Sequence, residues 1–116
     1  MMTFICYDKC TTCRKAKAWL EEKGAGFTVR PIKEKNPTAD ELRVWIAASG
    51  LPVRKFFNTS GLLYKELQLK DKLPQMTEDE MIALLATDGM LVKRPLLIGE
   101  DFVLVGFKES EWEAKV

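Results

Sequence analysis

The alternation of apolar and polar residues in the first third of the chain predicts a strand, a helix and a second strand. Residues 3–7 are partly β-branched and aromatic, which is typical of a strand. From Thr11 onward apolar residues recur at helical spacing among charged ones, and Gly24 is a suitable C-terminal stop. The apolar residues of segment 26–32 predict a second strand that ends at Pro31. The helical connection is long enough for the two strands to be parallel.

The middle of the chain, about residues 36–90, has the pattern of several helices. Two threonines are each followed three residues later by a glutamate and then by apolar residues, which is the capping-box pattern of a helix start. These pairs are Thr38 with Glu41 and Thr77 with Glu80. Short helices are predicted at residues 53–57 and 62–67, and Gly89 is expected to close the helix that begins at Thr77.

The last quarter of the chain returns to strand-like residues. Residues 95–98 and 102–105 are apolar and flank a Gly-Glu-Asp turn, so they predict a β-hairpin, and residues 110–114 predict a final short helix. The predicted order is therefore β-α-β, a helical insertion, a β-hairpin and a helix. This order indicates an α/β thioredoxin-like fold with a mixed central sheet. The length of 116 residues suits one domain that spans residues 1–116.

Composition and charge argue against several classes of function. The chain is 47% hydrophobic and 30% charged, and its 18 basic and 17 acidic residues leave a net charge of +1. A protein that binds nucleic acid directly would show a clustered basic surplus. No segment approaches the roughly 20 apolar residues that cross a membrane, and the N-terminus lacks the basic flank and apolar run of a signal peptide. We therefore expect a cytoplasmic location, where cysteines stay reduced.

Three cysteines, Cys6, Cys10 and Cys13, are the candidate chemical groups. A small, odd number does not suit a disulfide-stapled secreted fold, but it suits a reactive pair with one bystander. Cys6 lies within an apolar strand, where the role of a small buried hydrophobic residue is expected. Cys10 and Cys13 form a Cys-Thr-Thr-Cys segment between the first strand and the first helix. That position predicts a redox-active dithiol.

Other interpretations of the cysteine pair need residues that the sequence does not supply. A structural zinc site uses four ligands, and the chain has three cysteines and no histidine. A c-type haem site needs a histidine after the second cysteine, where Arg14 stands. An iron–sulfur cluster needs a fourth cysteine or a partner chain. An inert cysteine pair is the remaining alternative, and no metal or bound cofactor is expected.

The position of Cys10 before a helix predicts a reactive thiolate. Unpaired backbone N–H groups and the helix dipole favour an anion there, which lowers the pKa of the thiol. Arg14 lies four residues on, and because helical side chains lean toward the N-terminus its guanidinium is expected to cover the sulfur. Lys9 adds an adjacent positive charge. Cys13 lies about one turn further in, so Cys10 is the predicted nucleophile and Cys13 the resolving thiol.

The segment that begins at Cys10 and ends at Glu22 resembles the opening of the ArsC/Spx family. Further matches follow it in order along almost the whole chain. They are Ser49-Gly50-Leu51-Pro52-Val53-Arg54, Tyr64-Lys65-Glu66-Leu67, Arg94-Pro95-Leu96-Leu97-Ile98 and Val105-Gly106-Phe107-Lys108-Glu109-Ser110-Glu111. The family includes glutaredoxin-dependent arsenate reductases and the Spx regulators, which bind the C-terminal domain of the RNA polymerase α-subunit. The resemblance implies a thioredoxin-like fold and one of these two functions.

The resemblance also implies roles for individual residues. Cys10 matches the nucleophilic cysteine of the family's arsenate reductases, and Arg14 matches an arginine four residues later. Arg94 matches an arginine before a cis-proline, which would face the thiolate and stabilise negative charge. The residues expected to bind substrate are Thr11, Thr12, Arg14, Arg94 and Pro95.

Two further arginines that bind the oxyanion in the arsenate reductases have no match in this chain. At the first position the chain has Phe56-Phe57-Asn58, and at the second it has Gly106-Phe107-Lys108. Lys55 or Lys108 would supply a point charge there without the bidentate fork of an arginine. Many of the reductases also have a single cysteine in the loop and use glutathione, whereas this chain supplies its own Cys13.

Two functions therefore compete. The first, which we favour, is a thiol-disulfide oxidoreductase of the ArsC type, with arsenate as a candidate substrate and an external thiol reductant, either glutaredoxin with glutathione or thioredoxin. The second is an Spx-like redox-sensing transcriptional regulator that binds the RNA polymerase α-subunit. The Cys-Thr-Thr-Cys-Arg-Lys-Ala and Val-Gly-Phe-Lys-Glu sequences favour the regulator, whereas Gly50-Leu51-Pro52-Val53-Arg54 favours the enzymes.

Overall fold

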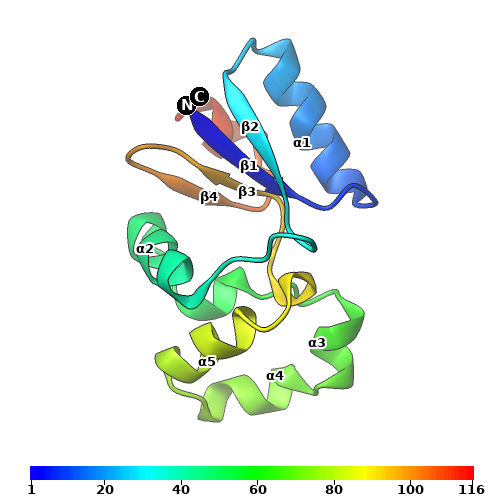
Figure 1. Cartoon of the computed structure of the whole chain (residues 1–116), viewed down its shortest axis with the longest axis vertical. Helices are drawn as coiled ribbons and strands as arrows, with labels where there is room; N and C mark the ends of the chain where they lie inside the picture. Colours follow the sequence, from blue (N-terminus) through cyan, green and yellow to red (C-terminus); the bar gives the residue numbers. More distant parts are fainter.

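A four-stranded sheet is formed by the N-terminal and C-terminal parts of the chain (Figure 1). The computed structural model describes residues 1–116. The strands β1 (Met2–Cys6), β2 (Phe27–Pro31), β3 (Leu96–Ile98) and β4 (Val103–Val105) lie in the order β2-β1-β3-β4. β1 and β2 are parallel, whereas β3 pairs antiparallel with both β1 and β4. The predicted mixed sheet and the predicted hairpin are confirmed.

One face of the sheet packs against the two helices that flank it. They are α1 (Thr11–Glu22), which connects β1 to β2, and α6 (Glu109–Glu113) near the C-terminus. Phe4 on β1 and Trp112 on α6 are almost completely buried, and their rings meet edge to face at 6.3 Å. The indole Nε1 of Trp112 donates to the carbonyl of Gly106 at 3.0 Å, which fixes the turn after β4. Cys13 belongs to this same apolar cluster.

The opposite face of the sheet packs against the chain between β2 and β3. Because neighbouring strand residues point to opposite faces, Ile5 and Leu96 join this second core. The elements here are α2 (Ala39–Ser49), η1 (Val53–Phe56), α3 (Leu62–Glu66), α4 (Leu69–Lys72), η2 (Leu73–Gln75), α5 (Glu78–Leu85) and η3 (Gly89–Leu91). In Figure 1 α2 lies beside the sheet near β4, and α3, α4 and α5 form the far end of the elongated molecule.

Both predicted capping boxes are present. The hydroxyls of Thr38 and Thr77 accept the N–H of Glu41 and Glu80, and the glutamate carboxylates accept the N–H of the threonines in return. Arg30 adds a bidentate ion pair to one of these boxes, with its Nη1 and Nη2 at 2.6 and 2.8 Å from the oxygens of Glu41. This pair joins the end of β2 to the start of α2.

The role predicted for Gly89 is wrong. The helix α5 ends at Leu85, and Gly89 instead begins η3. A Cβ at Gly89 would overlap the backbone carbonyl of Ile32, so the residue allows η3 to pack directly on the chain that leaves β2. The helix α4, which begins after Gln68 in the left-handed region at φ 53°, is a further element that the sequence pattern did not predict.

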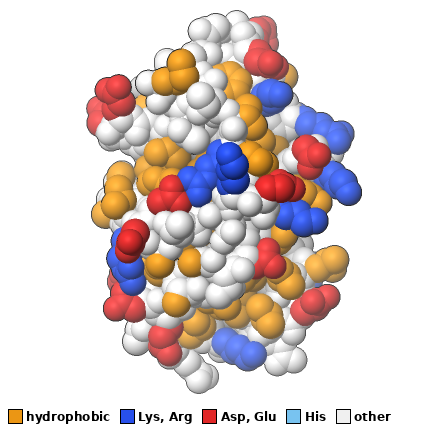
Figure 2. Space-filling model, in the orientation of Figure 1, with side chains coloured by type: hydrophobic (Ala, Val, Ile, Leu, Met, Phe, Trp, Pro, Cys, Tyr) orange, Lys and Arg blue, Asp and Glu red, His pale blue; other side chains and the backbone are white.

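Two backbone hydrogen bonds connect the helical segment to the chain that precedes β3. The N–H of Lys93 donates to Phe56 at 2.7 Å, and the N–H of Asn58 donates to Leu91 at 2.8 Å. The direction of the chain just before Arg94 is therefore set by the helical segment. None of the helices is both long and apolar enough to span a bilayer. On the face in Figure 2, basic and acidic side chains are interspersed without a large patch of one sign.

Candidate redox site

Cys10 and Cys13 lie at the N-terminus of α1, directly after β1. Cys10 is the N-cap residue, with extended backbone angles, and its Sγ accepts the N–H of Cys13 at 3.4 Å. A thiolate at this position faces the free N–H groups of the first helical turn and the positive end of the helix dipole. Cys10 is half-buried, whereas Cys13 is 3% exposed. The strand-to-helix turn therefore brings the two predicted cysteines together but gives them unequal access to solvent.

The surroundings of Cys10 favour its charged form. Partial burial acts to raise its pKa, but the N–H and thiol of Cys13, the charge of Arg94 and the N–H of Thr12 together outweigh burial and lower the pKa. The sequence-based expectation of a lowered pKa at this helix N-terminus agrees with the structure. The cation responsible is Arg94, from the other end of the chain.

Cys13 has the opposite setting. Its Sγ accepts the backbone N–H of Tyr7 at 3.4 Å. Burial raises the pKa of the Cys13 thiol to about 12, with further contributions from its hydrogen bond to Cys10 and from the neighbouring charges of Cys10 and Cys6, against the effect of the Tyr7 N–H. Cys6 is buried as predicted, and burial raises its pKa also. Of the three thiols only Cys10 has a lowered pKa, so it is the one that most readily forms a thiolate.

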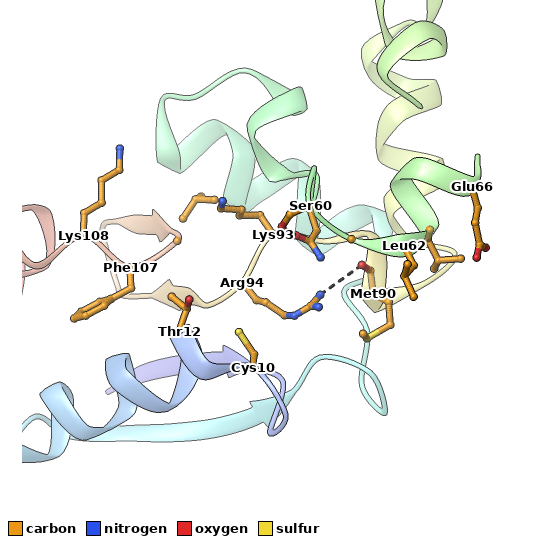
Figure 3. Close-up of a pocket in the computed structure, with 15 residues that line it drawn as sticks. Cys10, Thr12, Ser60, Leu62, Glu66, Met90, Lys93, Arg94, Phe107 and Lys108 are labelled. Atoms are coloured by element: carbon orange, nitrogen blue, oxygen red, sulfur yellow. Dashed lines mark hydrogen bonds between the residues drawn. The ribbon is translucent and has the colours of Figure 1, made fainter. Parts of the chain in front are cut away.

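Arg94 lies beside Cys10 in the loop that leads into β3 (Figure 3). Its peptide bond with Pro95 is cis. The guanidinium carbon lies 5.2 Å from the centre of the Tyr7 ring, and Nη1 donates to the carbonyls of Met90 at 3.4 Å and Val92 at 3.3 Å. The Nε atom is buried without a hydrogen-bond partner. A fixed cation with a free donor therefore lies beside Cys10.

The expected role of Arg14 is not supported by its position. Its Nε donates to the backbone carbonyl of Asp8 at 3.0 Å, so the guanidinium is turned back onto the loop that precedes α1. The charge that lowers the pKa of Cys10 most is that of Arg94, and neither Arg14 nor Lys9 is among the main causes. The sequence spacing placed Arg14 near the sulfur, but a local backbone acceptor competes for the side chain.

A cavity of about 750 Å³ opens beside Cys10, between the start of α1, the helical segment and the turn after β4. Of the residues predicted to bind substrate, Thr12 and Arg94 line it, whereas Thr11, Arg14 and Pro95 do not. Lys108 lines it as expected, but Lys55 lies at a different pocket. The other lining residues are Asn58, Ser60, Gly61, Leu62, Leu63, Glu66, Met90, Lys93, Val105, Gly106 and Phe107.

Lys93 and Glu66 are the charged residues of this cavity that sequence reasoning missed. Lys93 is the cation of the two. Its position directly before the Arg94-Pro95 pair was the available signal. The residues from the helical segment gave no comparable signal, because only the tertiary fold brings Ser60 and Leu62 to the cysteine. No group of three or more histidine, cysteine, aspartate or glutamate side chains is arranged to hold a metal ion.

Comparison with known proteins agrees with this geometry. The sequence model of the ArsC family matches residues 6–115. The chain belongs to the ArsC family. A solved structure from Bacteroides fragilis, described as an ArsC family related protein, is 61% identical, with a TM-score of 0.96 over 97% of this chain and 95% of that one. Its agreement confirms the thioredoxin-like α/β fold.

Relatives with two different functional descriptions are also similar to this chain. A solved structure from Streptococcus mutans, described as a possible arsenate reductase, is 46% identical, with a TM-score of 0.89 over 97% of this chain and 98% of that one. The global transcriptional regulator Spx of Staphylococcus haemolyticus is 30% identical over 112 residues, which cover 96% of this chain and 83% of Spx. Membership of the ArsC family is therefore compatible with an enzyme and with a regulator.

Proposed function

We propose that this ArsC family member is a thiol-disulfide oxidoreductase that works through Cys10 and Cys13. The Cys10 thiolate attacks one sulfur of a substrate disulfide, forms a mixed disulfide and releases the other substrate sulfur as a thiolate. Cys13 then gives up its proton and attacks Sγ of Cys10, which releases the second substrate sulfur and leaves a Cys10–Cys13 disulfide. Two electrons pass from the two cysteines to the substrate, whose sulfurs take up two protons.

The observation that supports this proposal is the unequal setting of the two thiols. Cys10 is accessible from the cavity, accepts a helix N–H and has a lowered pKa beside Arg94, whereas Cys13 is buried with a pKa of about 12. An accessible thiolate is suited to the first attack. The buried Cys13 thiol is suited to the second attack, because it lies in the same helix turn as Cys10. The substrate thiol that leaves the mixed disulfide also has a lower pKa than Cys13, so it leaves readily.

The direct test follows the fate of a small neutral disulfide, hydroxyethyl disulfide, by mass spectrometry after acid quench. In wild type, the peptide that contains Cys10 and Cys13 should become lighter by the mass of two hydrogens, because a disulfide forms between them. Cys13→Ser should instead accumulate the mixed disulfide on Cys10, and Cys10→Ser should give neither product. Cys6→Ala is the control, since Cys6 takes no part in either step, and should react like wild type. Reaction of Cys10→Ser at the wild-type rate would overturn the proposal.

Arsenate is a specific candidate for the substrate of this oxidoreductase. Two observations support it: the similarity to the Streptococcus mutans protein and the unpaired Nε of Arg94. In this version Cys10 attacks arsenate, so that an As–S bond replaces an As–O bond whose oxygen leaves as water, while Arg94 balances the oxyanion charge. Cys13 then attacks Cys10 Sγ, which breaks the As–S bond, passes two electrons to arsenic and releases arsenite, and leaves a Cys10–Cys13 disulfide. Recycling would use glutaredoxin with glutathione, or thioredoxin, in the cytoplasm. Consumption of NADPH in a coupled assay with these reductants should then depend on arsenate and on Cys10. The absence of any arsenate dependence in wild type would remove this version.

A regulator is the second candidate, and the similarity to Spx of Staphylococcus haemolyticus favours it. In that role the Cys10–Cys13 pair would report oxidation, and the protein would bind the C-terminal domain of the RNA polymerase α-subunit. A binding assay with this purified domain separates the candidates. Binding that changes when Cys10 and Cys13 are oxidised would favour the regulator, whereas no binding in either oxidation state would remove it.

A further inference from the structure

We propose that the substrate of the Cys10 site is a disulfide within a polypeptide, whose reacting cysteine has an acidic residue on one side and an apolar residue on the other. This inference rests on the proposed thiol-disulfide function and specifies its substrate class. The groups that support it are the cavity-lining side chains on either side of Cys10, none of which takes part in the chemical steps.

The size of the cavity exceeds what an inorganic oxyanion needs. A water molecule occupies about 30 Å³ of liquid, and a tetrahedral oxyanion is only a few times larger. The cavity measures about 750 Å³ and extends well beyond the Cys10–Arg94 pair. A ligand that fills it must therefore contact residues on both sides of the reacting sulfur.

One end of the cavity is cationic. The aliphatic stem of Lys93 runs past Gly106, where an added Cβ would lie 3.3 Å from Lys93 Cε, so the side chain is held beside the turn after β4. Lys93 forms no ion pair. Lys108 lies at the same end, but its Nζ is already 3.8 Å from Glu111. Lys93 is therefore the free cation that an acidic residue of a ligand would meet.

The other end of the cavity is apolar. Leu62 is 77% exposed at its edge, and Leu63 and Met90 line it nearby. In Figure 3 Leu62 and Glu66 lie on one side of the Cys10–Arg94 pair, and Phe107 and Lys108 lie on the opposite side. Together these side chains form an apolar strip beside the reactive group, bordered by polar residues, which is typical of a surface that is covered when a partner binds. Glu66 at this end disfavours a second acidic group there.

The backbone beside the cavity offers a further contact for a polypeptide. The N–H of Arg94 has no hydrogen-bond partner, although the N–H of Lys93 is bonded to Phe56 and the N–H of Gly106 to Pro95. This N–H is therefore available to an acceptor from a ligand. The carbonyl of an extended peptide segment would satisfy this donor while its cysteine reaches Cys10. A ligand with an acidic group, an apolar group and a backbone carbonyl to match these contacts is a peptide segment.

The test compares single-turnover rates of Cys10–Cys13 disulfide formation with symmetric disulfides of blocked heptapeptides that have a central cysteine. One peptide has aspartate before and leucine after the cysteine, a second has lysine in place of aspartate, and a third has serine on both sides. Glutathione disulfide and hydroxyethyl disulfide are the small-molecule references. Each rate is divided by the rate of Cys10 alkylation by neutral iodoacetamide, which corrects for changes in thiolate content.

The aspartate–leucine peptide should react about threefold to tenfold faster than the lysine peptide, and added salt should reduce the difference. Lys93→Gln should remove most of this preference, whereas Lys115→Gln, an equal loss of charge at an exposed residue away from the cavity, should leave it unchanged. Leu62→Ser should lower the rate of disulfide formation with the aspartate–leucine peptide. Val44→Ser, at another exposed apolar residue, should leave that rate unchanged.

Three results would overturn the inference while leaving the proposed function intact. They are equal rates for all peptides, a preference that survives Lys93→Gln, and a faster reaction with glutathione disulfide than with any peptide. Failure of the proposed function has a different signature, because hydroxyethyl disulfide would then also fail to oxidise the Cys10–Cys13 pair.

Discussion

The guanidinium of Arg94 lies over the aromatic ring of Tyr7, with its central carbon 5.2 Å from the ring centre. Tyr7 also donates its backbone N–H to Cys13 Sγ at 3.4 Å. Tyr7, the residue directly after β1, thus contacts both the cation beside Cys10 and the thiol that we propose resolves the mixed disulfide. This contact connects the loop before β3 to the N-terminus of α1, although more than 80 residues separate them in the sequence.

Removal of the Arg94 charge should make Cys10 less reactive. Because this charge lowers the pKa of Cys10, Arg94→Gln should move the midpoint of iodoacetamide labelling to higher pH and slow labelling severalfold at neutral pH. Arg14→Gln removes an arginine whose Nε is bonded to the carbonyl of Asp8, and it should leave the midpoint in place. Equal shifts in the two variants would contradict the assignment of the effect to Arg94.

The aromatic ring of Tyr7, and not its hydroxyl, should support the reaction of Cys10 with iodoacetamide. Tyr7→Leu removes the aromatic face under Arg94, so the guanidinium should become less ordered and labelling of Cys10 at neutral pH should slow. Tyr7→Phe keeps the face and the backbone N–H to Cys13, and should label like wild type. Slow labelling of Tyr7→Phe would show that the hydroxyl, and not the ring, is the group required.

Acid should weaken the fold through Glu41. The hydrogen bonds from Arg30 hold the pKa of the Glu41 carboxyl at about 2, below its unfolded value of about 4.3. A lowered folded-state pKa gives stability that is present above the unfolded value and lost as the pH falls toward the folded one. Because Glu41 is 34% exposed, solvent screening reduces the contribution to about 1–2 kcal/mol.

Glu41→Gln should therefore lose less free energy of unfolding than wild type between about pH 5 and about pH 2, as measured by urea denaturation. Glu80→Gln is the matched control, because Glu80 occupies the same position in the other capping box without an arginine partner. Its pH dependence should stay close to that of wild type. Similar behaviour of the two variants would locate the effect in the capping boxes and not in the Arg30 pair.

Gly89→Ala should be destabilising by about 1–3 kcal/mol, because the new Cβ would overlap the carbonyl of Ile32. The displacement should also slow labelling of Cys10, since Met90 is the next residue and its carbonyl accepts a hydrogen bond from Arg94. At Gly26 an added Cβ would meet only the flexible end of Met1, at an ordinary contact distance of 4.0 Å, so Gly26→Ala should change the free energy of unfolding by less than about 0.5 kcal/mol. Urea denaturation of both variants measures the difference.

Local patterns in the sequence were sufficient to predict the elements that define the fold. The capping boxes at Thr38 and Thr77 and the cysteine turn before α1 each depend on residues within a few positions of one another. The unequal burial of Cys10 and Cys13 follows from the same local geometry, because a residue at the N-cap is open to solvent and a residue one turn later faces the core.

Interactions between distant segments account for what the sequence did not predict. Arg14 has the right spacing from Cys10, but its Nε is bonded to the carbonyl of Asp8, and that competition has no signal in the spacing. Lys93 becomes a cavity residue only because the N–H of Lys93 pairs with Phe56 of the helical segment. The apolar pattern of α4 is short and follows a left-handed Gln68, so periodicity does not distinguish it from a loop.

In the strand order β2-β1-β3-β4, the edge strands are β2 and β4, and each offers few backbone hydrogen bonds to another chain. β4 has only three residues. β2 ends in Pro31, which has no N–H to donate, and its Arg30 side chain is bound to Glu41. Short edges and edge prolines limit the number of hydrogen bonds that an added strand could form. The protein should therefore resist edge-to-edge aggregation, even though the cavity beside Cys10 is open to solvent.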